Sequence, residues 1–115
     1  MESRKPWYLH QSPLLASSYL HFKTSVSEKS VLEPKTRELI MIALSSILRC
    51  PYCTEEHLRG ALEAGATQQE IAETLLVTAY EAAGTQLSWQ KEMFEKYLGG
   101  GNPKERTAGL NGRPT

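Results

Sequence analysis

The chain has 115 residues, of which 40% are hydrophobic, and its 13 basic residues balance 13 acidic ones. This length suits one domain with a modest core. Because the charges cancel and are interspersed, the sequence predicts no basic surface for nucleic acid or for an anionic membrane. The start is polar and no apolar run is long enough to cross a bilayer, so we predict neither a signal peptide nor a transmembrane helix. We therefore expect a cytoplasmic protein.

Hydrophobic periodicity favours helices throughout, and no strand pattern is present. We expect an N-terminal arm over residues 1–12, a helix end and loop over 24–33, and a flexible tail rich in Gly, Pro and charge over 99–115. The predicted helices cover residues 13–22, 35–49, 51–64, 67–84 and 85–98. The fold class is therefore all-α, as a compact bundle of about five helices in a single domain over residues 1–98.

Local signals set several of these boundaries. Pro51 suits the first position of a helix, with Cys50 as the N-cap. Gly65 suits a left-handed C-cap, and Thr67 with Glu70 has the spacing of a capping box for the next helix. Gly84 is predicted to end that helix.

The helix at 35–49 is apolar on almost every side, and the helices at 67–84 and 85–98 carry wide apolar stripes. A chain this small cannot bury a helix on all sides, so part of this surface is expected to meet another subunit. The sequence therefore predicts a homo-oligomer.

The segment at 50–57 holds both cysteines of the chain and one of its three histidines. On a helix Cys50, Cys53 and His57 lie at positions i, i+3 and i+7, on one face. The positive end of the helix dipole and a nearby imidazole both lower the pKa of a thiol, which favours thiol chemistry. In a reducing cytoplasm, a vicinal pair is more often redox-active than a permanent crosslink.

Two other interpretations of this pair stay open. Cys50, Cys53 and His57 could supply three ligands of a metal, with a carboxylate as the fourth, although structural zinc sites usually draw on a second cysteine pair that this chain lacks. The cysteines could also belong to a non-catalytic oligomeric module. Glu38 is either a solvated first-turn residue favoured by the helix dipole or a carboxylate directed at the cysteines.

Three motifs in this order resemble the carboxymuconolactone decarboxylase family and, more narrowly, its alkylhydroperoxidase-D-like branch. They are LEPKTRELI at 32–40, CPYCTEEH at 50–57 and AGATQQEI at 64–71. The resemblance covers about residues 13–98. It implies an all-α fold, trimers or hexamers, and a cysteine pair that reduces peroxides and is re-reduced by a dithiol partner protein, without a cofactor or a metal. The best-studied peroxidases of the branch have a second histidine where this chain has Tyr52, and the decarboxylases generally lack the cysteine pair.

The resemblance implies catalytic roles for Glu38, Cys50, Cys53 and His57. Our hypothesis is that His57, oriented by Glu38, takes a proton from Cys53, whose thiolate attacks the peroxide, after which Cys50 forms a disulfide with it. The spacing of four residues to His57 favours Cys53 as the attacking thiol, whereas the N-cap position favours Cys50. The expected activity is thus a thiol-dependent hydroperoxide reductase or disulfide oxidoreductase in antioxidant defence.

Overall fold

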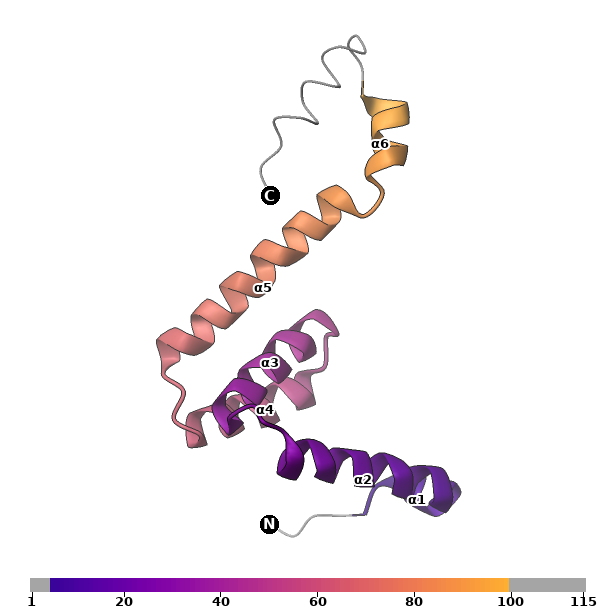
Figure 1. The fold of residues 1–115 in the computed structure, drawn as a ribbon, viewed down its shortest axis with the longest axis vertical. Helices are drawn as coiled ribbons and strands as arrows, with labels where there is room; N and C mark the ends of the chain where they lie inside the picture. The colour runs from indigo at the N-terminus through magenta and orange to yellow at the C-terminus, as the bar shows by residue number, and fades with distance from the viewer. Residues whose placement is uncertain (1–4, 100–115) are drawn as a thin grey trace. The chain divides into compact units, whose positions relative to one another are not determined.

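The computed structural model describes residues 5–99, and over that range every regular element is a helix (Figure 1). The all-α prediction is confirmed, although the described residues form six helices rather than about five. These are α1 (Trp7–Gln11), α2 (Pro13–Lys29), α3 (Pro34–Ile47), α4 (Pro51–Glu63), α5 (Gln68–Ser88) and α6 (Lys91–Leu98). Most of the predicted tail, residues 100–115, and the first four residues of the predicted arm lie outside the described residues.

Two of the predicted boundaries near the N-terminus are wrong. The arm contains the short helix α1, and α2 continues to Lys29 through a segment that we expected to end the helix. The hydroxyls of Ser18 and Thr24 bond to main-chain carbonyls four residues back, so these side chains remain compatible with the helix. Because no Gly or Pro interrupts the chain between Pro13 and Pro34, nothing in it forces an earlier end.

The predicted break at Gly84 is also wrong, because α5 passes through it and ends at Ser88. A single glycine costs a helix only about 1 kcal/mol relative to alanine, which the neighbouring turns can offset. Here the Thr85 hydroxyl bonds to the carbonyl of Glu81 across that position, at 3.0 Å. The chain then turns through residues 89–90 and α6 begins at Lys91.

The start of α5 forms the capping box that the sequence predicts. The main-chain N–H of Glu70 donates to Thr67 Oγ1 at 3.0 Å, and the N–H of Thr67 donates to Glu70 Oε1 at 2.8 Å. Glu70 Oε2 also lies 3.1 Å from Lys35 Nζ, which connects the start of α5 with α3. The hydrogen bond from Thr67 and then the bond to Lys35 lower the pKa of Glu70 below its ordinary value.

Residues 1–75 and 76–115 form two units, and the core belongs to the first. Ile42 of α3 is fully buried against Ala61 of α4 and Ala66 of the following loop, while Leu39, Leu58 and Ile71 pack around them. The small Ala61 side chain allows α3 and α4 to pack closely. This packing places the first turns of α3 opposite the middle of α4, where two of the predicted site residues lie.

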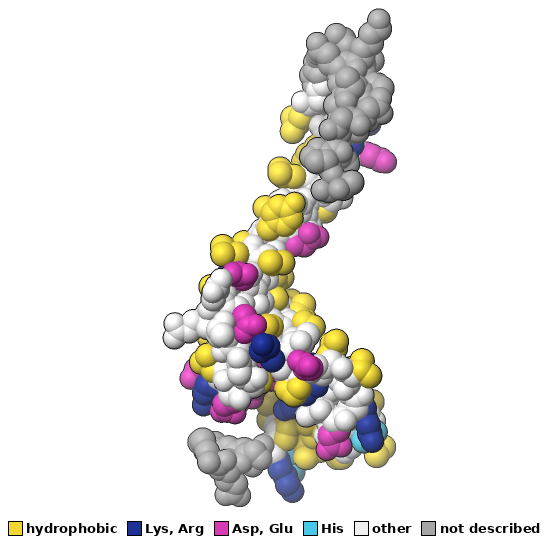
Figure 2. Space-filling model, turned by 60° about the vertical axis from the view of Figure 1, so that its left-hand side comes forward, with side chains coloured by type: hydrophobic (Ala, Val, Ile, Leu, Met, Phe, Trp, Pro, Cys, Tyr) yellow, Lys and Arg dark blue, Asp and Glu magenta, His cyan; other side chains and the backbone are white. Residues whose placement is uncertain are grey.

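Many large apolar side chains remain exposed in the single chain. Yellow hydrophobic side chains are visible on the surface in the view of Figure 2. In the second unit, none of the described residues is buried. Its exposed large apolar residues are Leu76, Val77, Tyr80, Leu87, Trp89, Met93, Phe94, Tyr97 and Leu98. Among the helices of residues 5–99, none is both long and apolar enough to cross a membrane.

Candidate active site

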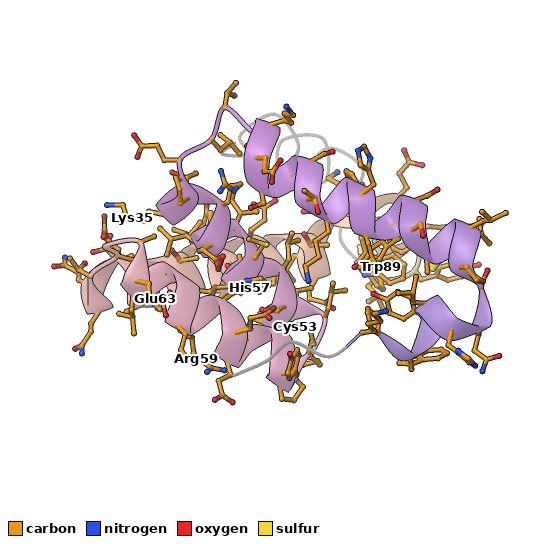
Figure 3. The ribbon with its side chains drawn as sticks, turned by 90° about the horizontal axis from the view of Figure 1, so that it is seen from below. Lys35, Cys53, His57, Arg59, Glu63 and Trp89 are labelled. Carbon is orange, nitrogen blue, oxygen red and sulfur yellow. A yellow bond between two sulfur atoms is a disulfide. The ribbon has the colours of Figure 1, made fainter. Side chains whose placement is uncertain are left out.

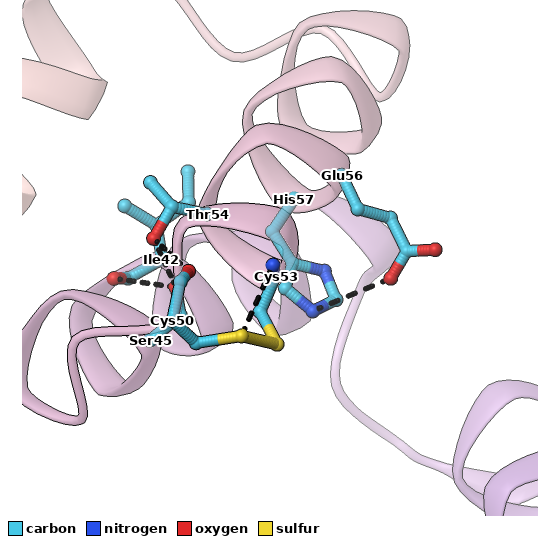
Figure 4. Close-up of a disulfide and its surroundings, with 7 residues drawn as sticks. All are labelled: Ile42, Ser45, Cys50, Cys53, Thr54, Glu56 and His57. Carbon is cyan, nitrogen blue, oxygen red and sulfur yellow. Dashed lines mark hydrogen bonds and ion pairs between the residues drawn. A yellow bond between two sulfur atoms is a disulfide. The ribbon is translucent and has the colours of Figure 1, made fainter.

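The two cysteines lie at the N-terminus of α4 and form a disulfide, with their Cα atoms 5.3 Å apart (Figure 4). Cys50 is the N-cap, as predicted, and its Sγ accepts a hydrogen bond of 3.2 Å from the main-chain N–H of Cys53. Pro51 occupies the first helical position, where its missing N–H leaves no bond unmade. The sulfur of Cys50 therefore faces the free N–H groups and the positive dipole end of α4.

The turn before α4 is fixed by hydrogen bonds and by an unusual backbone angle. Arg49 has a φ of 59°, in the left-handed region that residues other than glycine seldom adopt. The main-chain N–H of Cys50 donates to the carbonyl of Ser45 at 3.0 Å. Thr54 Oγ1 lies 3.1 Å from Ser45 Oγ and 2.9 Å from the Cys50 carbonyl oxygen, so the first turn of α4 is tied to the end of α3.

His57 lies one turn of α4 beyond Cys53, on the same side of the helix (Figures 3 and 4). Its Nδ1 is 2.9 Å from Oε2 of Glu38 on α3. A carboxylate can only accept, so Nδ1 carries the hydrogen and the neutral ring keeps its lone pair on Nε2. The His57 and Glu38 side chains are 19% and 23% exposed, and this shielding from water strengthens their interaction relative to a surface pair.

Glu56 supplies a second carboxylate near the imidazole. Its Oε1 lies 3.9 Å from His57 Nε2, longer than a hydrogen bond but within ion-pair distance. Glu56 therefore has little effect on the neutral ring, but it stabilises the imidazolium that forms when Nε2 takes up a proton. The ring thus has carboxylates near both nitrogens, with only Nε2 left without a hydrogen bond among the described residues.

The carboxylate of Glu38 rests directly against the backbone of Gly60. A Cβ atom added at Gly60 would lie 2.5 Å from Oε2 and 2.6 Å from Cδ of Glu38, closer than carbon atoms can approach. Gly60 follows His57 by three residues, on the same face of α4. The absence of a side chain at this position therefore leaves room for Glu38 to reach Nδ1.

Two cavities lie beside these residues. One, of about 390 Å³, is lined by His57, Glu38 and Glu56 together with residues of α2 and α3. The other, of about 450 Å³, is lined by Cys50, Pro51 and Thr54 and by the end of α3. The histidine and the N-terminal cysteine thus open onto different cavities.

A family model supports the resemblance that the motifs suggest. The model of the carboxymuconolactone decarboxylase family matches residues 13–96 of the chain. The chain belongs to the carboxymuconolactone decarboxylase family. The match includes all four predicted site residues.

A solved structure shares the fold of this carboxymuconolactone decarboxylase family chain. It is a structural-genomics crystal structure of a protein from Methanobacterium thermoautotrophicum, with a TM-score of 0.67 and 34% sequence identity. The match covers 76% of our chain and 98% of that one. A curated relative, described as uncharacterized protein 4 in the cox locus of Paracoccus denitrificans, is 34% identical over 67 residues, or 58% of our chain. The chain spans 60% of the length of that relative.

Sequence reasoning named Glu38, Cys50, Cys53 and His57, and the structure brings them together as two pairs, Glu38 with His57 and Cys50 with Cys53. The sequence analysis did not identify Glu56, Gly60 or the residues of α2 that line the cavity at His57. Glu56 and Gly60 could have been noticed from their positions, since Glu56 precedes His57 and Gly60 follows it by one helical turn. Within residues 5–99, no three or more His, Cys, Asp and Glu side chains are arranged so that they could share a metal ion.

Proposed function

We propose that this protein is a thiol-dependent hydroperoxide reductase of the alkylhydroperoxidase-D-like branch, with catalytic residues Glu38, Cys50, Cys53 and His57. One observation carries the proposal. Glu38 holds Nδ1 of an imidazole whose Nε2 makes no hydrogen bond to residues 5–99, one helical turn from a cysteine pair that forms a disulfide. A general base, a nucleophile and a resolving thiol are the three parts that such a reduction needs.

In the first step, His57 Nε2 takes the proton of the Cys53 thiol. The thiolate attacks the distal oxygen of the hydroperoxide, so an S–O bond forms and the O–O bond breaks. The leaving alkoxide takes the proton from the imidazolium and departs as an alcohol. Cys53 is then a sulfenic acid, oxidised by two electrons while the peroxide is reduced by two. Glu38 and Glu56 stabilise the imidazolium between these proton transfers.

In the second step, the Cys50 thiolate attacks the Cys53 sulfur. An S–S bond forms, the S–O bond breaks, and the leaving hydroxide takes up a proton and departs as water. The N–H of Cys53 and the helix dipole favour the thiolate form of Cys50. A partner protein with two thiols then reduces the disulfide and becomes a disulfide itself, which restores both cysteines.

The assembly proposed with this function is a homotrimer or homohexamer in the cytoplasm. The exposed apolar side chains of α3, α5 and α6 support it, since burying such surface between subunits is favourable.

The proposal is tested by counting thiols. The chain reduced by dithiothreitol and freed of reductant has two thiols, and one equivalent of an organic hydroperoxide should convert both to a disulfide with release of one alcohol. Metal analysis of the purified protein accompanies the count. Thiols that do not react with peroxide, together with about one bound metal ion per chain, would establish the metal-binding alternative instead.

Single substitutions separate the two cysteines. Cys50→Ser and Cys53→Ser should each abolish turnover with a dithiol, whereas only loss of the attacking cysteine abolishes the first, stoichiometric consumption of peroxide. We expect that cysteine to be Cys53. Tyr52→Phe, in the same turn and with an exposed ring, is the control and should keep turnover. A sulfenic acid trapped on Cys50 in Cys53→Ser, with none on Cys53 in Cys50→Ser, would reverse the roles.

A further inference from the structure

The cavity beside His57 lies between α2 and the packed pair of α3 and α4, all within the first unit. Its volume of about 390 Å³ is within the range of sites for small organic ligands. Because Glu38 and His57 line it, a ligand inside it is next to the proposed general base. A hydrogen peroxide molecule is little larger than a water molecule, so it would fill only a small part of this cavity.

One wall of the cavity is apolar. Tyr19, Phe22 and Val26 recur on α2 at the spacing of a single helix face, and Met41 of α3 completes the wall. The rings of Tyr19 and Phe22 are 55% and 64% exposed, so much of their surface is available to cover an apolar ligand.

The charged side chains of the lining divide into two groups. Both carboxylates lie at the imidazole, with Glu38 at 2.9 Å from Nδ1 and Glu56 at 3.9 Å from Nε2. Neither cation of the lining, Lys23 or Arg37, pairs with these carboxylates within 4.0 Å. Arg37 uses Nη1 to bond the carbonyl of Leu32 at 2.6 Å, which leaves its other guanidinium nitrogens free of that bond. Among residues 5–99, Lys23 makes no ion pair within 4.0 Å.

We propose that this cavity binds an organic hydroperoxide with an apolar body and an acidic group, such as a fatty-acid hydroperoxide. This inference rests on the peroxidase function proposed above. The apolar body lies against the wall of α2, the carboxylate pairs with Lys23 and Arg37, and the hydroperoxide group lies toward His57, which is one helical turn from Cys53. The redox step is the one described above, in which the hydroperoxide becomes the corresponding hydroxy acid.

The test compares a linoleic-acid hydroperoxide with its methyl ester, which has the same body and peroxide but lacks the charge. Hydrogen peroxide is assayed beside them. We expect kcat/KM for the free acid to exceed that for the ester by up to about fivefold, the upper end of what an exposed ion pair contributes. The ratio should fall toward one at high salt, because exposed charges are then screened.

Lys23→Gln should lower the ratio of acid to ester well below fivefold, and the remainder is the part that Arg37 supplies. Lys29→Gln is the matched control, because Lys29 is on the same helix, is exposed and does not line the cavity. It should keep the ratio of the unmodified protein. Lys23 is the better residue to change, since Arg37 also bonds the turn before α3. Calorimetric binding of the hydroxy acid and its ester gives the same comparison without turnover.

The outcomes separate this proposal from the one it rests on. Equal rates and equal binding for acid and ester, with hydrogen peroxide still consumed, would overturn the acid-binding site and leave the peroxidase intact. A ratio that is unchanged in Lys23→Gln would overturn the site as well. If no peroxide is consumed and the thiol count does not change, both proposals fail together.

Discussion

Two regions of the chain differ in how much of their side-chain surface is buried and hydrogen-bonded within a single chain. They are the packed pair of α3 and α4, and the helical segment at residues 76–99. In the first, Ile42 and Ala61 are buried, and Glu38, Ser45, Thr54 and His57 all have hydrogen-bond partners. In the second, none of the described residues is buried, and large side chains such as Trp89 and Tyr97 are more than 60% exposed. The proposed catalytic residues all belong to the first.

This difference separates what the site needs, which is contacts within one chain, from what the segment at 76–99 needs, which is burial of its apolar side chains. The geometry around His57 follows from contacts within one chain, so it does not depend on a partner for its first layer of hydrogen bonds. The segment at 76–99 has exposed apolar side chains, as expected of the interface proposed above, because such side chains stabilise a protein only when water is removed from them. Changes in the first region should therefore alter chemistry, and changes in the second should alter assembly.

Apart from the two cysteines, the largest effect is expected at the imidazole. His57→Ala should slow peroxide reduction by at least about tenfold while the helical content and the mass of the assembly stay unchanged, since general acid–base assistance is worth roughly 10²- to 10⁴-fold. Stopped-flow measurement of peroxide consumption, beside light scattering, checks this. A variant that loses activity only because it dissociates would break the separation of the two regions.

The carboxylate behind the imidazole should act through it. If Glu38 only orients and polarises the ring, Glu38→Gln in the His57→Ala background should add little, because residues that work as a unit are not additive. The rate should also rise with pH through a thiol pKa below the unperturbed value of about 8.5, and that pKa should rise in His57→Ala. Multiplicative effects with an unmoved thiol pKa would leave the helix terminus as the only activator.

The local signals that determine α4 and the start of α5 could be read from the sequence. Pro51 after Cys50, Gly65 with its φ of 95°, and Thr67 with Glu70 each act within one helical turn, so a sequence window contains all that they need. Helix ends were wrongly predicted at other glycine and serine residues, because a long helix tolerates both. The continuation of α2 to Lys29 and of α5 through Gly84 are the two examples.

The site was predictable in its residue types and not in its fine contacts. The helical spacing placed Cys53 and His57 on one face, and the motif resemblance pointed to Glu38. The contact of Glu38 with the Gly60 backbone joins two helices, as does the wall that α2 contributes to the cavity. Such contacts depend on how helices pack, which periodicity within each helix does not specify.

Another prediction concerns the segment at 76–99. Light scattering at micromolar concentration should give three or six times the 12.9 kDa of one chain. Phe94→Glu should lower that mass, because it would bury a charge in the proposed interface. Lys96→Glu introduces the same side chain two residues along, at an exposed polar position, and should not. A mass of one chain for the unmodified protein would mean that these helices do not form an interface.

A further prediction compares Gly60 in α4 with Gly84 in α5. Gly60→Ala should slow peroxide reduction by about threefold, a fraction of the effect of losing the base, because the new methyl group displaces the Glu38 carboxylate from Nδ1. Gly84→Ala meets nothing within 4 Å, so activity should be unchanged and stability should rise by about 0.5–1 kcal/mol.

Thermal unfolding measured beside the kinetics makes the comparison of the two glycine variants decisive. Both substitutions favour the helix, so a slower Gly60→Ala enzyme cannot be explained by weaker helix formation. In the Glu38→Gln background, Gly60→Ala should add little further loss. A Gly60→Ala enzyme with full activity would show that the carboxylate can move without consequence for the imidazole.

The smallest effect is expected at Glu70, where the first region meets the start of α5. Its pKa is lowered, so the charged form is favoured by folding, and its contribution to stability is present above the ordinary carboxylate pKa and is lost as the pH falls through the lowered one. Glu70→Gln should therefore have a slightly lower Tm than the unmodified protein at pH 7, and the two values should converge near pH 3. Glu63→Gln is the control, because it makes the same change at an exposed carboxylate that has no ion pair within 4.0 Å among residues 5–99, and it should not reproduce this pH-dependent convergence. A Tm difference that stays constant across this range would mean that the charge of Glu70 is not its cause. Equal Tm values at pH 7 would mean that the capping bond from Thr67, which an amide oxygen can also accept, contributes more than the charge.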